Sequence, residues 1–371
     1  MTPISNDQKA AIKRRCTRFL SFEKPRSAAD WLTSLAASPA LPLGLDSYSA
    51  GPAIEQLEQR VATLLGKEAA LWFPKGIIAQ QAALLAHAQT TGRKTIALHP
   101  KSHLALDEAN AIERLSGLTA IRVGRDYQHF APSDLDQIAE PLAALTLELP
   151  LRRSGFLAPS WDELTAIAAW ARDHHIPFHL DGARLWETQP WYNKPLAEIA
   201  ALTDSLYVSL YKGLGGMSGS ILAGPAPLIA AAKIWRLRFG GDLPLAFPLI
   251  LSALDGLTNT LPLMPQYHQH ACTLAAAIHA APGLTAFPHP PHCNSFQVHF
   301  QAPAAALQTA ALEYAENHQT WLFGWFEPTA TPTTACAEIV VGPAALDWPI
   351  SDILAALTSL QTTAQKSTPS P

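Results

Sequence analysis

Apolar positions in the first half of the chain form short runs that alternate with helically spaced stretches. Those from Ile54 to Leu65 follow helical spacing, and Gly66 predicts the end of that helix. The run 70–73, Ala-Leu-Trp-Phe, is typical of a short buried strand. A turn over residues 74–76 then leads into a second helix, which we expect to run to about residue 88.

The alternation continues to about Leu257. Helices are expected at 107–115, from Ser133, and from Ser160, where Ser-Trp-Asp-Glu has the sequence of a capping box. This rhythm predicts an α/β fold with a large, mostly parallel sheet that helices cover on both faces. The further strands are expected at 95–98, 119–123, 145–149, 176–180 and 205–210.

The two ends of the chain do not follow this rhythm. The first 45 residues contain no convincing strand; a short helix is expected within 12–20, and Asp30 could cap another that starts at Trp31. After Leu257 the pattern predicts a small α+β domain. Its helices are expected near 273–280, 304–317 and 350–360, and its strands near 295–300 and 337–341.

The domain organisation follows from these patterns. We expect an N-terminal arm with helices over residues 1–45, a large α/β domain over 46–257 and a small C-terminal domain over 258–361. Residues 362–371 are polar and contain proline, which predicts a disordered tail.

Composition narrows the classes of partner. The 371 residues are 48 % hydrophobic and 15 % charged, as in an ordered globular protein, and are enough for two packed domains. The net charge of −4 and the lack of a basic run argue against nucleic acid. The sequence shows no apolar stretch of signal-peptide or bilayer-spanning length, so we expect no membrane partner. Four scattered cysteines read as reduced thiols of a cytoplasmic protein.

Candidate chemistry lies at two predicted strand ends. His-Leu-Asp-Gly-Ala-Arg covers 179–184, and Tyr-Lys-Gly-Leu-Gly-Gly covers 211–216. Ligands of open α/β sheets bind at the carboxyl ends of the strands. Asp181 and Lys212 suit pyridoxal phosphate (PLP), because a lysine amine can form a Schiff base with its aldehyde and a carboxylate can keep its pyridine nitrogen protonated.

Two further positions fit the same cofactor. Gly76 opens a helix directly after a strand, where free amides and the helix dipole favour a phosphate. His103 follows a strand and a proline and could stack on the cofactor ring. Each of these residues alone could instead be an ordinary surface charge or turn glycine.

Two other kinds of site fit the sequence less well. His179 with the adjacent His174 and His175 could suggest a metal site, but histidines at a helix end cannot easily share a face with the strand, so no metal is expected. The run 213–219 is similar to a dinucleotide-binding loop, but Ser218 stands where its last glycine would fall.

The motifs together resemble the threonine aldolase / β-eliminating lyase family. The segment 179–186 looks like the family signature, 208–215 looks like its lysine motif, and 66–76 is similar to its phosphate-binding region, with Ser102-His103 at the site of a stacking histidine. The resemblance covers roughly residues 48–241. It implies PLP fold type I, similar to aspartate aminotransferase, and a homodimer or homotetramer with the active site at the interface.

The resemblance also implies roles for individual residues. Lys212 would be the Schiff-base lysine, Asp181 would pair with the pyridine nitrogen and His103 would stack on the ring; these are the candidate catalytic residues. Arg184, Tyr48 and Arg153 are the candidate substrate contacts. The other expected cofactor contacts, near the phosphate or the phenolic oxygen, are Lys75, Gly76, Ile77, Ser209 and Arg184.

The sequence departs from the family at positions that bear on the substrate. Lys75-Gly76-Ile77 replaces Ser-Gly-Thr, and no histidine follows Glu148 in 148–153. Pro244 stands where the family has an arginine, and no arginine near Glu338 matches the one that grips the substrate carboxylate. Arg152 or Arg153 could replace that contact. Alternatively, either one could be an ordinary surface residue.

Three functions follow from this pattern. The first is aldol cleavage of a β-hydroxy amino acid to glycine and an aldehyde, as in threonine aldolases. The second is β-elimination or other carbanion chemistry on an amino acid. The third is a non-catalytic binding protein on a degenerate PLP fold, which the altered positions would favour.

Overall fold

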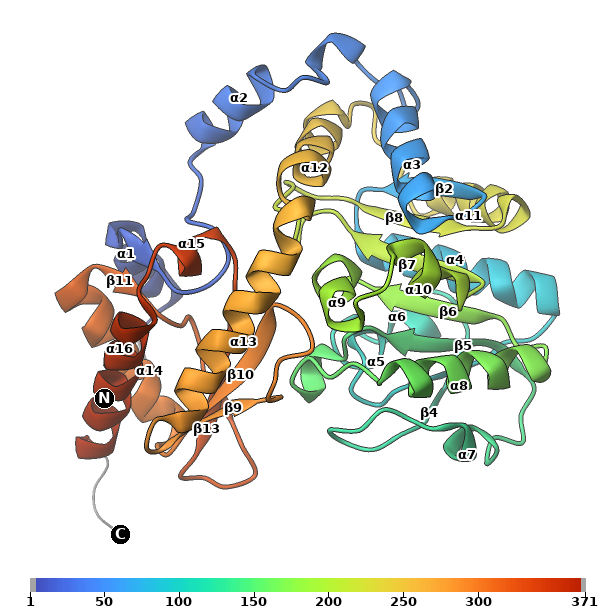
Figure 1. Ribbon diagram of the computed structural model, residues 1–371. Coiled ribbons are helices and arrows are strands. Elements are labelled where there is room, and N and C mark those ends of the chain that lie inside the picture. The colour runs from blue at the N-terminus through green and yellow to red at the C-terminus, as the bar shows by residue number, and fades with distance from the viewer. Residues whose placement is uncertain (1–4, 368–371) are drawn as a thin grey trace. The chain divides into compact units, whose positions relative to one another are not determined.

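The computed structural model describes residues 5–367, which form two compact units (Figure 1). The sheet unit comprises residues 27–264, and the terminal unit joins residues 5–26 to residues 265–367. The sequence-based boundaries were different, because they kept residues 1–45 as one arm and began the small domain at residue 258. The chain thus returns to its own N-terminal segment when it builds the terminal unit.

A seven-stranded sheet forms the centre of the sheet unit. Its order is β2-β8-β7-β6-β5-β3-β4, and every pair is parallel except those of β8, which runs antiparallel to both neighbours. The expected mostly parallel α/β sheet is confirmed. The strands are β2 (Ala69–Phe73), β3 (Thr95–Leu98), β4 (Thr119–Arg122), β5 (Leu142–Glu148), β6 (Phe178–Gly182), β7 (Ser205–Ser209) and β8 (Ser220–Gly224).

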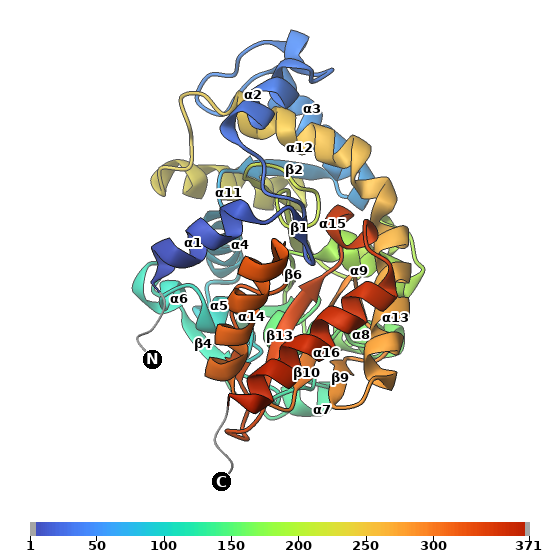
Figure 2. The same ribbon diagram turned by 90° about the vertical axis from the view of Figure 1, so that its left-hand side faces the viewer.

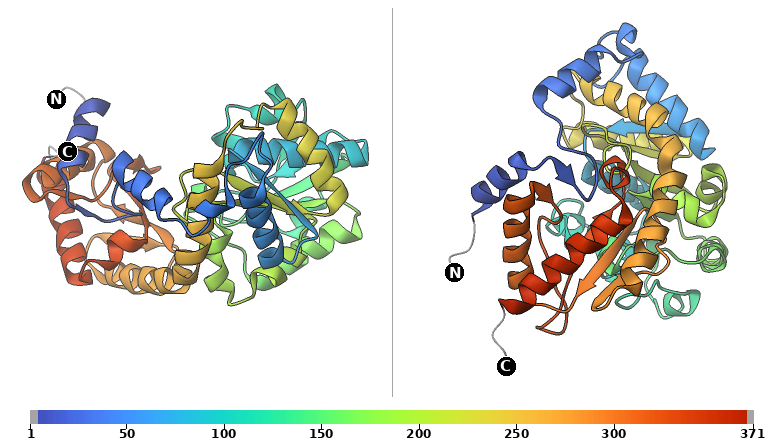
Figure 3. Two further views of the ribbon diagram at one scale, coloured as in Figure 1. Left: turned by 90° about the horizontal axis from the view of Figure 1, so that it is seen from above. Right: turned by 60° about the vertical axis from the view of Figure 1, so that its left-hand side comes forward.

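Helices lie on both sides of this sheet, as two views show (Figures 1 and 3). Every residue of β5, β6 and β7 is buried, as expected for strands covered on both faces. α4 and α11 pack together over one face, where Phe73, Ala83 and Leu222 belong to a shared core. The helices are α2 (Ala28–Ala36), α3 (Pro52–Leu65), α4 (Gly76–Thr91), α5 (His103–Leu106), α6 (Ala111–Arg114), α7 (Pro132–Leu135), α8 (Trp161–Asp173), α9 (Leu185–Tyr192), α10 (Leu196–Ala201), α11 (Ala226–Arg238) and α12 (Phe247–Asn259), with 3-10 turns η1 (Leu41–Leu43), η2 (Arg152–Ser154) and η3 (Leu261–Leu263).

A four-stranded antiparallel sheet forms the terminal unit. Its order is β12-β13-β10-β9, and α14 and α16 lie side by side against it (Figure 2). The expected α+β character of this part is confirmed. Its elements are α1 (Asn6–Arg15), β1 (Arg18–Phe19), α13 (Met264–Ala280, which begins at the unit boundary), β9 (Leu284–Phe287), β10 (Ser295–Phe300), α14 (Ala304–His318), β11 (Thr320–Trp321), β12 (Glu327–Pro328), β13 (Ala335–Val340), α15 (Pro343–Leu346) and α16 (Ile350–Lys366).

Several sequence-based expectations at the chain ends were wrong. Arg18–Phe19 is a short strand that pairs in parallel with β11, so the first 45 residues do contain a strand. α2 is capped by Ser27, whereas Asp30 is the third helical residue and accepts from the Ser27 N–H. α16 continues to Lys366, so residues 362–366 are helical rather than a disordered tail; residues 368–371 lie outside the described part of the chain.

Two elements of the sheet unit also differ from expectation. Of the helix predicted over 107–115, only α6 is helical, because Ala109 and Asn110 both have positive φ angles; α5 lies before the predicted range. Strand β8 and helix α11 were not predicted, since a glycine-rich stretch precedes them and hides the strand signal. No helix in residues 5–367 is long and apolar enough to cross a membrane.

The capping box of α8 provides a test of local stability. Ser160 Oγ accepts from the Glu163 N–H at 3.3 Å, and the Glu163 carboxylate accepts from the Ser160 N–H at 2.7 Å. Ser160→Ala should lower the free energy of unfolding by about 1 kcal/mol in urea denaturation, because the helix start loses an acceptor. Ser160→Asp, which keeps an acceptor, should stay near the wild type; equal stability of all three proteins would contradict the role of the cap.

Candidate active site

Side chains from several strand ends meet in one cavity of about 240 Å³ in the sheet unit. It lies at the carboxyl ends of β6 and β7, where the register places Asp181 beside Tyr207. Parallel strands end at the same edge of the sheet, so residues far apart in sequence converge there. The lining residues are Lys75, Gly76, Ile77, Gln80, His103, Asp107, Glu108, Asp181, Tyr207, Tyr211 and Lys212.

The amine of Lys212 is held in this cavity by the turn that follows β7. Ser209 Oγ accepts from the backbone N–H groups of Tyr211 and Lys212, each at 3.3 Å, which tightens the turn. Burial and, next, the Arg184 charge lower the pKa of Lys212 to about 8, although nearby carboxylates including Asp181 act to raise it. A larger fraction of this amine is therefore uncharged near neutral pH than in an exposed lysine, as a nucleophile requires.

Asp181 is a buried carboxylate that lines the same cavity as Lys212. It is buried at the end of β6, where its Oδ1 accepts from the Ala183 N–H at 3.1 Å. Burial raises the pKa of Asp181, while the positive charges of Lys212 and His103 act to lower it. A buried carboxylate beside a buried amine can hold a proton on a cationic ring nitrogen.

The start of α4 forms another wall. The first amides of a helix have no intrahelical partner, and no Lys75 side-chain group caps them. Gly76 is the only residue type that fits, because a Cβ at this position would overlap the Tyr207 hydroxyl and lie 2.9 Å from its Cζ. α4 therefore presents backbone amides to the cavity, with Lys75 exposed beside them.

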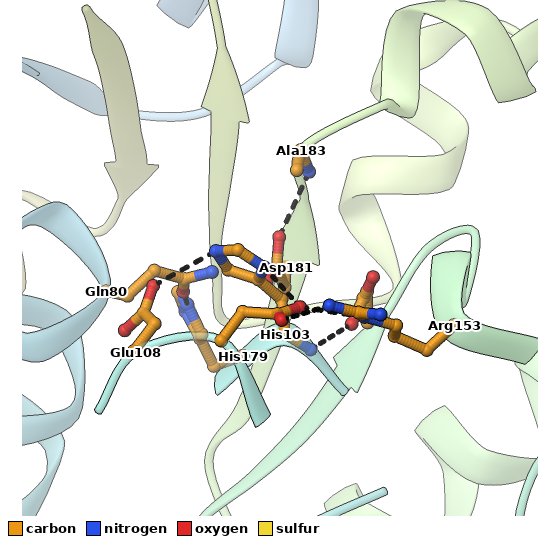
Figure 4. A network of polar contacts seen from close by, with 9 residues as sticks. Gln80, His103, Glu108, Arg153, His179, Asp181 and Ala183 are labelled. Carbon is orange, nitrogen blue, oxygen red and sulfur yellow. Dashed lines mark hydrogen bonds and ion pairs between the residues drawn. The ribbon is translucent and has the colours of Figure 1, made fainter. Parts of the chain in front are cut away.

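His103 is fixed from both sides, as Figure 4 shows. Its backbone N–H donates to Glu148 Oε2 at 2.6 Å, and its Nδ1 lies 3.1 Å from Asp107 Oδ2. Asp107 also accepts from the guanidinium of Arg153, with Nε at 3.1 Å. Burial lowers the pKa of His103, as does the Lys212 charge, so its ring is mostly neutral at neutral pH.

Three buried glutamates surround the Lys212–Asp181 pair, and sequence reasoning assigned them no role. Burial raises the pKa of Glu108 to about 8 and those of Glu148 and Glu187 to about 7, and the Asp181 charge contributes at the first two. Glu148 ends an apolar strand directly opposite Asp181, which is the signal that could have identified it. Glu108 and Glu187 had no comparable signal, because each lies in or beside a helix.

Most residues expected in the site converge. Lys75, Gly76, Ile77, His103, Asp181 and Lys212 line the cavity, and Ser209 holds the loop of Lys212. Arg184 lies outside the lining, with its Cζ 5.3 Å from the Phe156 ring centroid, although its charge acts on Lys212. Arg153 binds Asp107, whereas Tyr48 is 68 % exposed and does not line the cavity.

His174 and His179 do not come together in the structure. His179 is buried and bonded to Gln80 and Ser205, whereas the His174 Nδ1 lies 2.8 Å from the Trp170 carbonyl oxygen. Among the described residues, no group of three or more His, Cys, Asp or Glu side chains is arranged to hold a metal ion.

Comparison with known proteins agrees with this geometry. Residues 34–303, more than half of the chain, match the model of the β-eliminating lyase family. The chain belongs to that family. It is also similar to a protein assigned as an L-allo-threonine aldolase from Listeria monocytogenes EGD-E, with 32 % identity, a TM-score of 0.90, and coverage of 96 % of this chain and 99 % of the other.

Relatives with curated names carry related descriptions. An assigned low-specificity L-threonine aldolase from Schizosaccharomyces pombe is 31 % identical over 59 % of this chain and 60 % of its own length. The low specificity L-threonine aldolase of Escherichia coli K12 is 28 % identical over 67 % of this chain and 75 % of its own length. The match to the first therefore spans less than two thirds of that relative. The chain has PLP fold type I, and family and fold together imply a PLP cofactor.

The packing of Gly76 against Tyr207 can be tested by paired substitutions. Gly76→Ala should lower the free energy of unfolding by about 1–3 kcal/mol, because the new methyl group meets the phenol. Adding Tyr207→Phe should recover part of this loss, since the closest atom is removed. Urea denaturation measures both; a double variant no more stable than Gly76→Ala would show that another contact limits this position.

The raised pKa of Glu187 makes stability depend on pH. Because burial raises it from 4.5 to about 7, the folded protein is favoured when Glu187 is protonated, and this contribution is lost as pH rises from about 4.5 to about 7. Glu187→Gln should therefore stabilise the protein by on the order of 1 kcal/mol at pH 8 and less at pH 5. Glu198→Gln, the same substitution at an exposed position, is the matched control in urea denaturation.

Proposed function

We propose that this protein is a PLP-dependent lyase that cleaves the Cα–Cβ bond of a β-hydroxy amino acid, releasing glycine and an aldehyde. The observation that carries this proposal is the shared cavity of Lys212, Asp181 and His103 at the start of α4. The names of the relatives support the same substrate class, since several are described as low-specificity L-threonine aldolases.

The residues of the cavity fit PLP. Lys212 would hold the cofactor through its partly uncharged amine, and Asp181 would keep the pyridine nitrogen protonated. The phosphate would meet the amides of Gly76 and Ile77 and the charge of Lys75, which compensates for the absent hydroxyl side chains. When bound, PLP supplies an electron sink that stabilises negative charge on the α-carbon of the amino acid.

His103 is the proposed base for the β-hydroxyl proton. Because Asp107 accepts from the Nδ1 side of the ring, the neutral ring keeps its lone pair on Nε2. Nε2 lies 3.6 Å from Glu108 Oε1 within the cavity lining, and the ring is mostly uncharged at neutral pH. General-base catalysis of this kind typically contributes about a hundredfold to ten-thousandfold.

Arg184 is the proposed ligand of the substrate carboxylate. Its charge acts on Lys212, Asp181 and Glu187, so the guanidinium lies near the reacting groups. Arg153 is the weaker choice, because Asp107 already holds its guanidinium. Tyr48 remains a proposed contact that a second copy of the chain would contribute in a homodimer or homotetramer.

The proposal is tested by incubating the PLP-loaded protein with L-threonine and L-allo-threonine. Glycine and acetaldehyde should form in equal amounts, measured by amino-acid analysis and by coupled reduction of the aldehyde. Lys212→Ala should reduce both to background, because the cofactor loses its anchor, whereas Lys233→Ala on α11 should retain activity. If neither amino acid yields glycine, the aldolase proposal fails.

β-Elimination is the second candidate, because the same carbanion chemistry serves both reactions and Pro244 stands where aldolases of the family carry an arginine. Incubation with amino acids that bear a leaving group on the β-carbon would then release ammonia and an oxo acid. PLP binding without turnover in either assay would favour a non-catalytic binding protein.

A further inference from the structure

A chain of four buried polar side chains runs from the interior of the sheet unit to the cavity. His87 Nε2 lies 2.7 Å from Ser205 Oγ, and Ser205 Oγ lies 2.8 Å from His179 Nδ1. His179 Nε2 lies 2.7 Å from Gln80 Oε1, the link drawn in Figure 4. None of the four side chains is more than 4 % exposed, yet Gln80 lines the cavity.

Both histidines of this chain are neutral. Burial lowers the pKa of His87 to about 4 and that of His179 to about 3. A neutral imidazole has one nitrogen that donates and one that accepts. If one nitrogen of such a histidine donates a hydrogen bond, its other nitrogen must accept one. The donor and acceptor roles at one link therefore determine those at the next.

The Gln80 oxygen sets that direction. A carboxamide oxygen only accepts, so His179 donates from Nε2 and must accept at Nδ1 from the Ser205 hydroxyl. Ser205 Oγ in turn accepts from His87 Nε2–H. Every link then pairs one donor with one acceptor, and a flip of the Gln80 carboxamide would require both histidines to change tautomer.

The free end of the chain is the amide nitrogen of Gln80. The Gln80 oxygen accepts a hydrogen bond from His179. Among residues 5–367, no hydrogen bond is formed by the Gln80 Nε2. Gln80 follows Gly76 by four residues in α4, so both lie on the same face of the helix. This places an oriented N–H donor one helical turn beyond the amides at the start of α4, on the wall shared with Lys212 and Asp181.

The free-energy cost of burying these polar side chains indicates that the hydrogen-bonded chain has a function. A buried donor or acceptor left without a partner costs about 1–3 kcal/mol, so a partly formed chain would be worse than apolar side chains. Neighbouring positions of α4 are apolar, and the side chains of Ala79, Ala83 and Leu84 are fully buried. Gln80 is therefore a polar exception in an apolar part of the helix.

We propose that Gln80 binds the cofactor by donating a hydrogen bond from its carboxamide to an oxygen of PLP, and that His179, Ser205 and His87 are positioning residues that lock this donor. The proposal rests on the proposed PLP site but not on aldol cleavage, so it is tested by cofactor affinity without a substrate.

The first experiment titrates the cofactor-free protein with PLP and follows absorbance. Gln80→Leu should raise the dissociation constant about three- to tenfold, the effect of one lost hydrogen bond. Gln80→Glu should raise it at least as much, because a carboxylate still accepts from His179 but offers an acceptor to the cavity. Gln89→Leu on the exposed end of α4 is the matched control and should leave affinity unchanged.

An unchanged affinity of Gln80→Leu for PLP would overturn the proposal. The same result is expected if Gln80 contacts the amino acid substrate instead of the cofactor. A wild-type protein that binds no PLP would overturn the proposed function as well, whereas loss of aldol activity alone would leave the affinity test intact.

The second experiment asks whether the buried chain acts through Gln80. Ser205→Ala should raise the dissociation constant by a smaller factor than Gln80→Leu, because the carboxamide loses its lock but keeps its donor. The double variant should be no weaker than Gln80→Leu alone. Multiplying losses would show that Ser205 affects the site by another route and would overturn the positioning role.

A third measurement uses the unmodified protein, so it does not depend on any variant folding. Nitrogen-15 NMR of histidine-labelled protein should show His179 and His87 neutral from pH 6 to 8, both protonated at Nε2. Protonation of His179 at Nδ1 would reverse the chain and turn the Gln80 oxygen toward the cavity, which would overturn the proposal whatever the catalytic activity.

Discussion

Lys212 and Asp181 come from neighbouring strands and share one buried site, and each changes what the other can do. Burial disfavours the charged form of both groups, and their mutual attraction opposes that effect. The balance leaves Lys212 with a pKa of about 8 instead of about 10.5. The amine can therefore act near neutral pH because burial and the Arg184 charge lower its pKa by more than the neighbouring carboxylates raise it.

The pKa values of three neighbouring glutamates are shifted by burial as well. Glu108, Glu148 and Glu187 could bring three more negative charges to the site, but their raised pKa values mean that they are partly protonated near neutral pH. Glu148 has a structural task as well, because its carboxylate accepts from the backbone N–H groups of His103 and Arg152. One buried acid thus ties two loops to the end of β5, and the position of the His103 ring depends on it.

The sequence predicted the parts of this arrangement that depend on periodicity. The strands at 95–98 and 295–300 lie where expected, and Asp181 and Lys212 meet because ends of neighbouring parallel strands share an edge. It could not predict side chains whose place depends on a broken helix: Glu108 reaches the cavity because Ala109 and Asn110 adopt positive φ angles. Strand β8 was missed because the loop before it carries its glycines for close packing, as Gly216 against the Leu210 carbonyl shows.

The contact between Gly76 and Tyr207 links packing to the site. Tyr207 belongs to the core between β7 and α4, and its hydroxyl fills the space where any other residue at position 76 would place a Cβ. The start of α4 is therefore seated as near to the sheet as a backbone allows, which brings its unpaired amides to the same edge as Asp181. The proposed phosphate site therefore needs no hydroxyl side chain. This accounts for a family member that keeps the glycine while the residues on either side have changed to lysine and isoleucine.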